Sequence, residues 1–232
     1  MDPESGETRL GRFGWKAGKV SIKHQTVSAL NTDMGVMTAI LPDPDCGSAQ
    51  ADCGPSGAEL DEEYVDLLVK YVALLGVPPQ RDYDDPSVQN GAQLFKEAGC
   101  AGCHTPSHQT SEYHPFAELR DQTIHPYTDL LLHDMGPGLA DNLGEGEASG
   151  SEWRTAPLWG LGLSACVTGG MTEAPQGQRG CIPEEGYLHD GRARTVEEAI
   201  LWHGGEADDA RAAYEGLSAQ QQEDMLNFLY SL

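Results

Sequence analysis

The residues best suited to chemistry are two cysteines and a histidine in one short stretch, Cys100-Ala101-Gly102-Cys103-His104. Two thiols separated by two residues match the spacing at which the vinyl groups of haem are attacked, and the histidine that follows can bind the iron. The same two thiols could instead form a redox dithiol or half of a zinc site. The surroundings of the motif must decide between these three uses.

Those surroundings favour haem. A helical pattern ends at Gly99, directly before the motif, whereas a thioredoxin-like dithiol follows a strand. The remaining four cysteines lie in pairs whose spacing does not suit a zinc site. We therefore expect one covalent haem c, attached through Cys100 and Cys103, with His104 bound to its iron.

The other cysteines form two local pairs, Cys46/Cys53 and Cys166/Cys181, in segments rich in Gly, Pro and Asp. We expect a disulfide in each pair, with free thiols as the alternative. Disulfides persist in oxidising compartments, and c-type haem is attached outside the cytoplasm. We therefore expect a periplasmic or otherwise exported protein, although the opening residues "MDPESGETRL" do not form a signal peptide.

The charge of the chain limits the classes of partner that it can bind. The formal net charge is -23 at pH 7, which would repel phosphate backbones and anionic membranes, so we expect no nucleic-acid partner. No apolar run is long enough to span a membrane. A basic redox partner protein would suit the charge, and a solvated acidic surface is the simpler explanation.

Helical patterns account for most of the regular structure. Apolar spacing, capping residues and glycine or proline stops predict helices over the ranges 60–75, 86–98, 126–134, 195–203 and 218–232. No strand pattern persists between 105 and 194. The fold class that we expect is all-α: a loop-rich, cytochrome c-like haem domain over 59–232 behind an irregular N-terminal extension over 1–58.

The second axial ligand of the iron must be a Met or His distant from His104. His203 ends the helix expected over 195–203, and it shares the apolar face with three residues at helical spacing: Val196, Ala199 and Ile200. A buried imidazole needs a polar partner, and an iron would be one. Two neighbouring residues remain as alternative ligands: Met135 and His133.

Three further residues are expected near the haem. A ligating histidine usually donates its free ring N–H to a carbonyl, which fixes its tautomer. The segment "MGPGL" resembles the proline-containing loop that does this in class I c-type cytochromes, so the Pro137 carbonyl is the acceptor expected for His104, with an ordinary Gly-Pro turn as the alternative. Arg154 is a candidate partner for a haem propionate, because its planar guanidinium suits a carboxylate. Trp159 is expected to pack on or near the ring as a large apolar group.

Several stretches together resemble a known family. The segments are "GRFGWKAG", "GCAGCHTP", "IHPYTDLLLHDMGPGLAD", "EWRTAPLWGLGL", "HDGRARTVEEAILWHGGEA" and "FLYSL". They are similar to the di-haem oxidoreductase (thiol oxidoreductase-like) family, which is related to bacterial di-haem cytochrome c peroxidases and MauG. In those peroxidases an "HDG"-like segment leads to the axial ligand of the second haem, usually Met. In this chain the matching position is His203, so the resemblance implies bis-histidine ligation of the second haem.

The resemblance also exposes a departure. Relatives carry two Cys-x-x-Cys-His motifs and this chain has one, so 1–58 resembles the remnant of a first haem domain without its attachment motif. Another subunit or domain would then carry the first haem, with Trp15 near the path between the haems. Relatives also bind calcium between their haem domains, but no residue here identifies its ligands.

The combined expectation is a c-type cytochrome domain that carries single electrons, as part of a di-haem peroxidase-like oxidoreductase. Two alternatives stay open. The chain itself could be a haem peroxidase, which requires an open or displaceable sixth position on the iron. It could also be a haem-bearing structural subunit of an electron-transfer complex.

Overall fold

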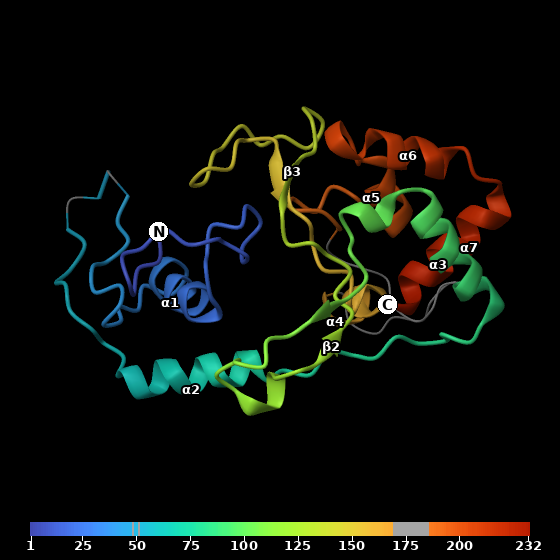
Figure 1. Cartoon of the computed structure of the whole chain (residues 1–232). Coiled ribbons are helices and arrows are strands. Elements are labelled where there is room, and N and C mark those ends of the chain that lie inside the picture. The colour runs from blue at the N-terminus through green and yellow to red at the C-terminus, as the bar shows by residue number, and fades with distance from the viewer. Residues whose placement is uncertain (48, 51, 169–185) are drawn as a thin grey trace. The chain divides into compact units, whose positions relative to one another are not determined.

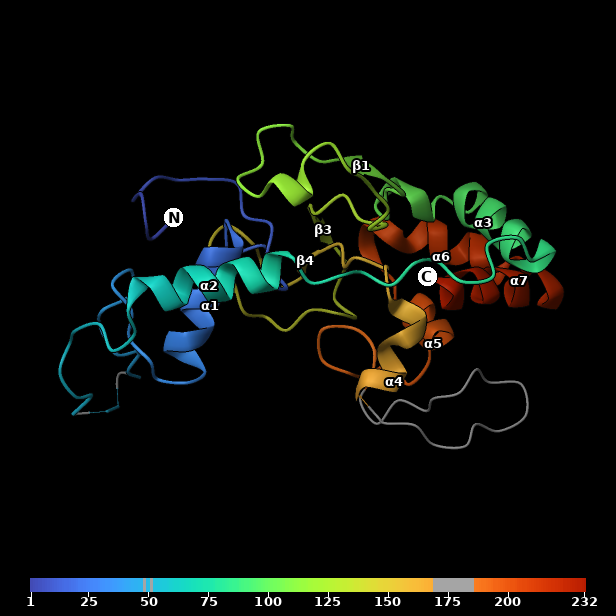
Figure 2. The same ribbon diagram turned by 90° about the horizontal axis from the view of Figure 1, so that it is seen from below.

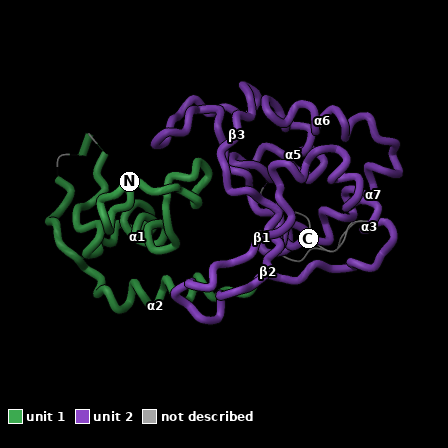
Figure 3. The backbone as a smooth tube through the Cα atoms, viewed as in Figure 1, with its two compact units in different colours: residues 1–76 green, residues 77–232 purple. Residues whose placement is uncertain are grey.

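The computed structural model describes residues 1–47, 49–50, 52–168 and 186–232. The chain divides into two compact units, Met1–Gly76 and Val77–Leu232 (Figure 3). The helix expected over 60–75 lies in the first of these units. The expected domain bounds, 1–58 and 59–232, stay a prediction. The origin of 1–58 as a remnant of a haem domain stays a prediction.

The first unit is built on two helices, α1 (Ile22–Thr32) and α2 (Glu62–Ala73). Helix α1 is not among the helices expected from the sequence; the Ser21 side chain caps its N-terminus. Helix α2 lies where it was expected, and it buries Val65. Its expected apolar stripe is largely exposed in the structure, at Tyr64, Leu67, Leu68, Tyr71, Val72 and Leu75.

A disulfide closes a loop of the first unit. Cys46 and Cys53 are joined, as the sequence predicted, and their Cα atoms lie 6.0 Å apart. The second expected pair includes Cys181, which lies outside the described residues. Cys100 and Cys103 are free, so both thiols of the haem motif are available for attachment.

The core of the second unit lies where α3 (Pro86–Glu97) packs against α7 (Ala219–Ser231), and Figures 1 and 2 show the two helices side by side. Gly91 permits the close approach, because a methyl group there would lie 2.0 Å from the Asp224 carbonyl oxygen. The expected stripe of α7 is buried, as predicted, at Met225, Phe228, Leu229 and Leu232.

The end signals read from the sequence are confirmed in both helices. The Asp85 side chain caps α3, with proline at the first helical position, and Gly99 follows the helix with a φ of 86°. Ser218 and Gln221 form the capping box of α7. The other α-helices in the described part of this unit are α4 (Ser164–Thr168), α5 (Val196–Leu201) and α6 (Asp208–Glu215).

The expected all-α class is wrong. The described residues also form two small antiparallel sheets: β1 (His108–Gln109) pairs with β2 (Thr123–Ile124), and β3 (Leu132–Asp134) pairs with β4 (Glu152–Arg154). Backbone N–H and C=O groups in long connections must find partners, and short strand pairs supply them. Strands of two or three residues are too short to show an alternating sequence pattern.

The helix expected over 126–134 is also wrong. Strand β3 occupies the end of that stretch. Tyr127 and Leu130 adopt positive φ angles of 53° and 62°, which a right-handed helix does not allow. The segment instead forms a tight loop that leads into a strand.

Candidate haem-binding site

The attachment motif begins where α3 has just ended. Gly99 reverses the chain, and Cys100–Gly102 form a short 3₁₀ turn. Burial raises the pKa of the Cys100 thiol to about 11, and burial followed by the nearby Asp129 and Glu206 carboxylates raises that of Cys103. Both cysteines are therefore neutral thiols at neutral pH. Cys100 also packs against the main hydrophobic core, so its sulfur faces an apolar environment.

His104 is oriented by a backbone carbonyl, although not the expected one. Its Nδ1 lies 3.0 Å from the carbonyl oxygen of Tyr127, so the bond expected for Pro137 belongs to Tyr127. The reason is local: the segment after Pro126 turns sharply, and the backbone N–H groups of Thr128 and Asp129 bond to the carbonyls of Thr105 and Cys103. This pairing places the 126–129 segment beside the motif.

Aromatic packing holds Tyr127 in place. Its ring lies against Phe95 of α3 and Phe228 of α7, with centroid distances of 6.2 and 5.7 Å, and Phe95 and Phe228 are 5.4 Å apart. Phe95 also lies 6.2 Å from the ring of His104. The carbonyl that orients His104 is thus tied to the α3–α7 core, which offsets the cost of the positive φ at Tyr127.

His203 lies just beyond the C-terminus of α5. The Thr195 side chain caps the start of this helix. Nδ1 of His203 lies 2.8 Å from the carbonyl oxygen of Ala199, and Arg211 donates a hydrogen bond of 2.8 Å to the His203 carbonyl. The Nδ1–H group of His203 is therefore satisfied within its own helix, as that of His104 is by Tyr127.

The two imidazole rings lie close together. The ring centroids of His104 and His203 are 6.4 Å apart, and their planes meet at 46°. Two imidazoles on opposite sides of one metal ion, each bonded at about 2 Å, would have centroids about 6 to 6.5 Å apart. With each Nδ1 engaged by a carbonyl, Nε2 is the nitrogen left on each ring for a metal. The pair therefore fits an iron held between two histidines.

The protonation states of these rings suit metal binding. Burial lowers the pKa of His104 to about 4 and also lowers that of His203. Both imidazoles are consequently neutral at neutral pH, and only the neutral form can bind a metal. Together with the two thiols of Cys100 and Cys103, the donor set matches a covalently attached haem.

The alternative ligand His133 is engaged elsewhere. Its Nε2 lies 2.8 Å from Asp129 and its Nδ1 lies 2.9 Å from Glu206, so carboxylates hold both nitrogens. The other alternative, Met135, lines a hollow with Trp202 beside the His203 segment. The two carboxylate partners of His133 favour His203 over this alternative, and Met135 stays an alternative ligand.

The same region contains donor atoms that could hold a different metal. One ligand atom each from Cys103, Asp129 and His133 lies within 4.8 Å of the others. Attachment of haem to Cys103 would consume its thiol, and the imidazole already has two carboxylate partners. We therefore interpret this group through its hydrogen bonds rather than as a metal site.

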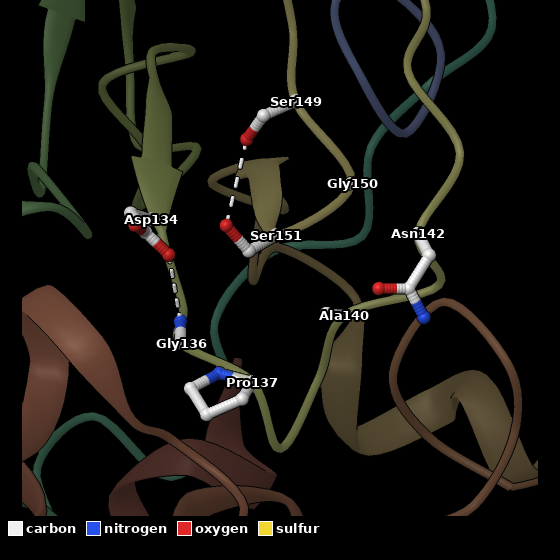
Figure 4. Close-up of a pocket in the computed structure, with 8 residues that line it drawn as sticks. All are labelled: Asp134, Gly136, Pro137, Ala140, Asn142, Ser149, Gly150 and Ser151. Carbon is white, nitrogen blue, oxygen red and sulfur yellow. Dashed lines mark hydrogen bonds between the residues drawn. The ribbon is translucent and has the colours of Figure 1, made fainter.

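The remaining predicted residues lie as follows. Pro137 lines an open hollow together with Asp134, Asn142 and Ser151 (Figure 4). Arg154 is half-buried, which lowers its pKa, and it donates to the Thr155 carbonyl. Trp159 is 36% exposed. Contact of any of these three with haem stays a prediction.

Sequence reasoning missed the groups that orient the ligands. The ligands are oriented by the backbone carbonyls of Tyr127 and Ala199, and the types of these two residues do not indicate such bonds. A tyrosine also gives no indication of the positive φ that Tyr127 adopts. Asp129 and His133 do have a spacing of four, but they meet without a helix. Glu206, distant in sequence from His133, offered no signal at all.

Comparison with known proteins supports a family assignment. The family described as "Di-haem oxidoreductase, putative peroxidase" matches residues 2–232, nearly the entire chain. No curated protein and no solved structure gave a significant match. The chain belongs to this di-haem oxidoreductase family, as the sequence resemblance indicated, and the family name identifies haem as its cofactor.

Proposed function

We propose that this member of the di-haem oxidoreductase family carries single electrons through one covalent haem c whose iron is bound by His104 and His203. The observation that carries the proposal is the separation of 6.4 Å between the two ring centroids, with the Nδ1 of each ring bonded to a backbone carbonyl. Two fixed, neutral imidazoles at this separation form a ligand pair for one metal ion.

Each residue of the site has a distinct task. Cys100 and Cys103 anchor the porphyrin through their sulfurs. His104 and His203 would hold the iron, and the carbonyls of Tyr127 and Ala199 keep Nδ1 protonated, so that Nε2 would be the donor. When bound, the haem supplies reversible one-electron exchange at its iron. With both imidazoles bound to it, the iron would be shielded from small molecules.

The compartment and the partners follow from the same proposal. Attachment of haem c takes place outside the cytoplasm, and the Cys46–Cys53 disulfide favours an oxidising compartment. Among the described residues, no helix is long and apolar enough to cross a membrane. We place the protein in the periplasm or another exported location, with a redox partner whose docking surface is basic, because the chain has a net charge of -23.

The family name also favours a second function. "Di-haem" and "peroxidase" in the family description imply that a first haem, carried by another domain or subunit, works with the one bound here. The His104/His203 haem would then deliver electrons to that partner haem. Peroxide turnover by this chain alone would require displacement of His203, since neither axial position would otherwise be open.

The test is the spectroscopy of the haem-loaded chain. We expect its mass to exceed that of the polypeptide by one haem. We also expect a low-spin ferric state, a sharp α-band on reduction, and no significant peroxide turnover with an electron donor. A mass equal to that of the bare polypeptide, or a high-spin ferric iron that turns over peroxide rapidly, would contradict the proposal.

A further inference from the structure

His133 connects two carboxylates on opposite sides of it. Its Nε2 lies 2.8 Å from Asp129 and its Nδ1 lies 2.9 Å from Glu206. A carboxylate only accepts hydrogen bonds when ionised, so an imidazole that bonds two of them donates from both nitrogens and is a cation. Burial lowers the pKa of His133, but the bonds to Glu206 and Asp129 outweigh it and raise the pKa overall. We call this trio of Asp129, His133 and Glu206 the His133 bridge.

One end of the bridge is fixed to the attachment side of the site. The backbone N–H of Asp129 donates to the Cys103 carbonyl at 2.9 Å, and the Sγ of Cys103 lies 3.8 Å from Nδ1 of His133. Asp129 also lies two residues after Tyr127 in the sequence, and the carbonyl of Tyr127 orients His104. This end of the bridge therefore belongs to the same local structure as His104.

The other end of the bridge is fixed to the segment of His203. Glu206 follows His203 by three residues, and only Gly204 and Gly205 lie between them. Its second carboxylate oxygen accepts a hydrogen bond from the Asp134 backbone at 3.0 Å. Two glycines contribute no side chain that could anchor this segment, so Glu206 is its first side-chain anchor after the ligand.

Close backbone packing brings the two ends together. A methyl group on Gly205 would lie 2.2 Å from the Asp134 carbonyl oxygen and 2.7 Å from the Gly136 nitrogen. The chain at 204–206 therefore runs directly against the end of β3, the strand that carries His133. The helix before His203, by contrast, has only six residues, and its own hydrogen bonds give limited support at its C-terminus.

We propose that the His133 bridge is a positioning device, which ties the His203 segment to the attachment side and makes His203 hard to displace from the iron. The inference rests on the proposed bis-histidine site. It adds the reason why His203, the less firmly held of the two ligands, stays in place. His133 and Glu206 act here through His203 and do not touch the iron themselves.

The test measures how quickly an external ligand replaces His203. In the haem-loaded ferric protein, cyanide binding is limited by the release of His203, so its rate reports how firmly this residue is held. We expect Glu206→Gln and His133→Gln each to accelerate binding by roughly tenfold, the effect of losing one hydrogen bond between charged groups. The double variant should be no faster than either single variant, because both remove the same bridge.

Matched controls separate the bridge from general effects of charge. Glu223→Gln removes the same charge from an exposed position on α7, and His125→Gln replaces an exposed histidine; both should bind cyanide at the wild-type rate. Glu206 itself is largely exposed, with 56% of its side chain accessible, so its isosteric replacement is compatible with folding. The absorption spectrum of each variant before cyanide is added verifies that the haem is attached and low-spin.

The outcomes distinguish the inference from the proposed function. If the wild-type spectrum is not that of a six-coordinate iron with two histidines, the function fails and the inference fails with it. If the wild type is six-coordinate but Glu206→Gln and His133→Gln bind cyanide at the wild-type rate, the inference alone is overturned. Accelerations that multiply in the double variant would equally overturn it, since they would show two independent effects.

Discussion

The two ligands that the proposed iron would share are held in different ways. His104 directly follows Cys103 of the attachment motif, and its orienting carbonyl, from Tyr127, is fixed by Phe95 and Phe228 in the core. His203 lies at the end of a six-residue helix and is supported by a bond within that helix and by Arg211. Core packing holds the first histidine, and local hydrogen bonds and charges hold the second.

This difference indicates which ligand can exchange. Close packing resists displacement, because a shift of one core group must move its neighbours. Hydrogen bonds near the surface contribute less, since water competes for the same donors and acceptors. We therefore expect the side of His104 to determine whether the haem domain folds, and the side of His203 to determine what reaches the iron.

The largest effect should follow from removal of the exchangeable ligand. If His203 binds the iron, the fraction of wild-type molecules with an open site would be small, and this small fraction would reduce the apparent affinity for external ligands. His203→Ala removes that competition and should raise the cyanide affinity of the ferric protein by about 10- to 1000-fold. Equilibrium titration followed by absorbance measures the change, and added imidazole should restore the low-spin spectrum.

Exposed His125 provides the control for this substitution. His125→Ala should leave both the spectrum and the cyanide affinity unchanged. A His203→Ala protein that stays low-spin without imidazole would show that another residue binds the iron, and Met135 would be the first residue to test.

The next effect concerns the core behind His104. Gly91→Ala places a methyl group against the Asp224 carbonyl oxygen and the Phe228 side chain, so α3 and α7 must separate. We expect a loss of about 2 to 3 kcal/mol in the free energy of unfolding of the haem-loaded protein, as overpacking typically costs. Gly76→Ala, where a methyl group meets open space, should change stability far less in the same urea titration.

Equal midpoints for the two glycine variants would contradict the importance of the α3–α7 contact.

The sequence predicted both helices of this contact, α3 and α7, together with their caps and the buried face of α7, because each depends on patterns within a few residues. It could not predict that Phe95, Tyr127 and Phe228 meet, since that contact joins three distant segments.

The haem site shows the same limit. Cys100, Cys103 and His104 were evident from their spacing, and His203 from its place on an apolar helical face. The acceptor for His104 was assigned to Pro137, whereas the structure places Tyr127 there. The deciding feature is the left-handed backbone conformation of Tyr127, which cannot be predicted from a residue type that rarely adopts it.

A smaller effect is expected from Arg211, on the exchangeable side. Its guanidinium donates to the His203 carbonyl and pairs with Asp208 at 2.8 Å. Arg211→Gln should accelerate cyanide binding by about threefold, since a partly exposed charged hydrogen bond contributes about 1 kcal/mol or less. Arg194→Gln, at a side chain that is 86% exposed, is the matched control in the same stopped-flow measurement, and equal rates in both variants would exclude a role for Arg211.

The smallest effect is a dependence of stability on pH. The pKa of His133 is raised in the folded protein by Glu206 and Asp129, despite burial, which lowers it. The contribution of His133 to the free energy of unfolding is therefore complete below its pKa in the unfolded chain, about 6.5. It is lost as pH rises through the higher pKa of the folded protein. The stability difference between wild type and His133→Gln, about 1 kcal/mol or less, should shrink with rising pH in urea titrations. A difference that grows with pH would contradict the assignment.

The central claim is tested most directly by identifying the two atoms bound to the iron. Electron paramagnetic resonance of the oxidised, haem-loaded protein, prepared with ¹⁵N-labelled histidine, reports the spin state and the axial nitrogens. The account predicts a low-spin iron with two histidine nitrogens, one of which disappears in His203→Ala. A sulfur ligand, an open high-spin site, or a second nitrogen that survives the loss of His203 would contradict it.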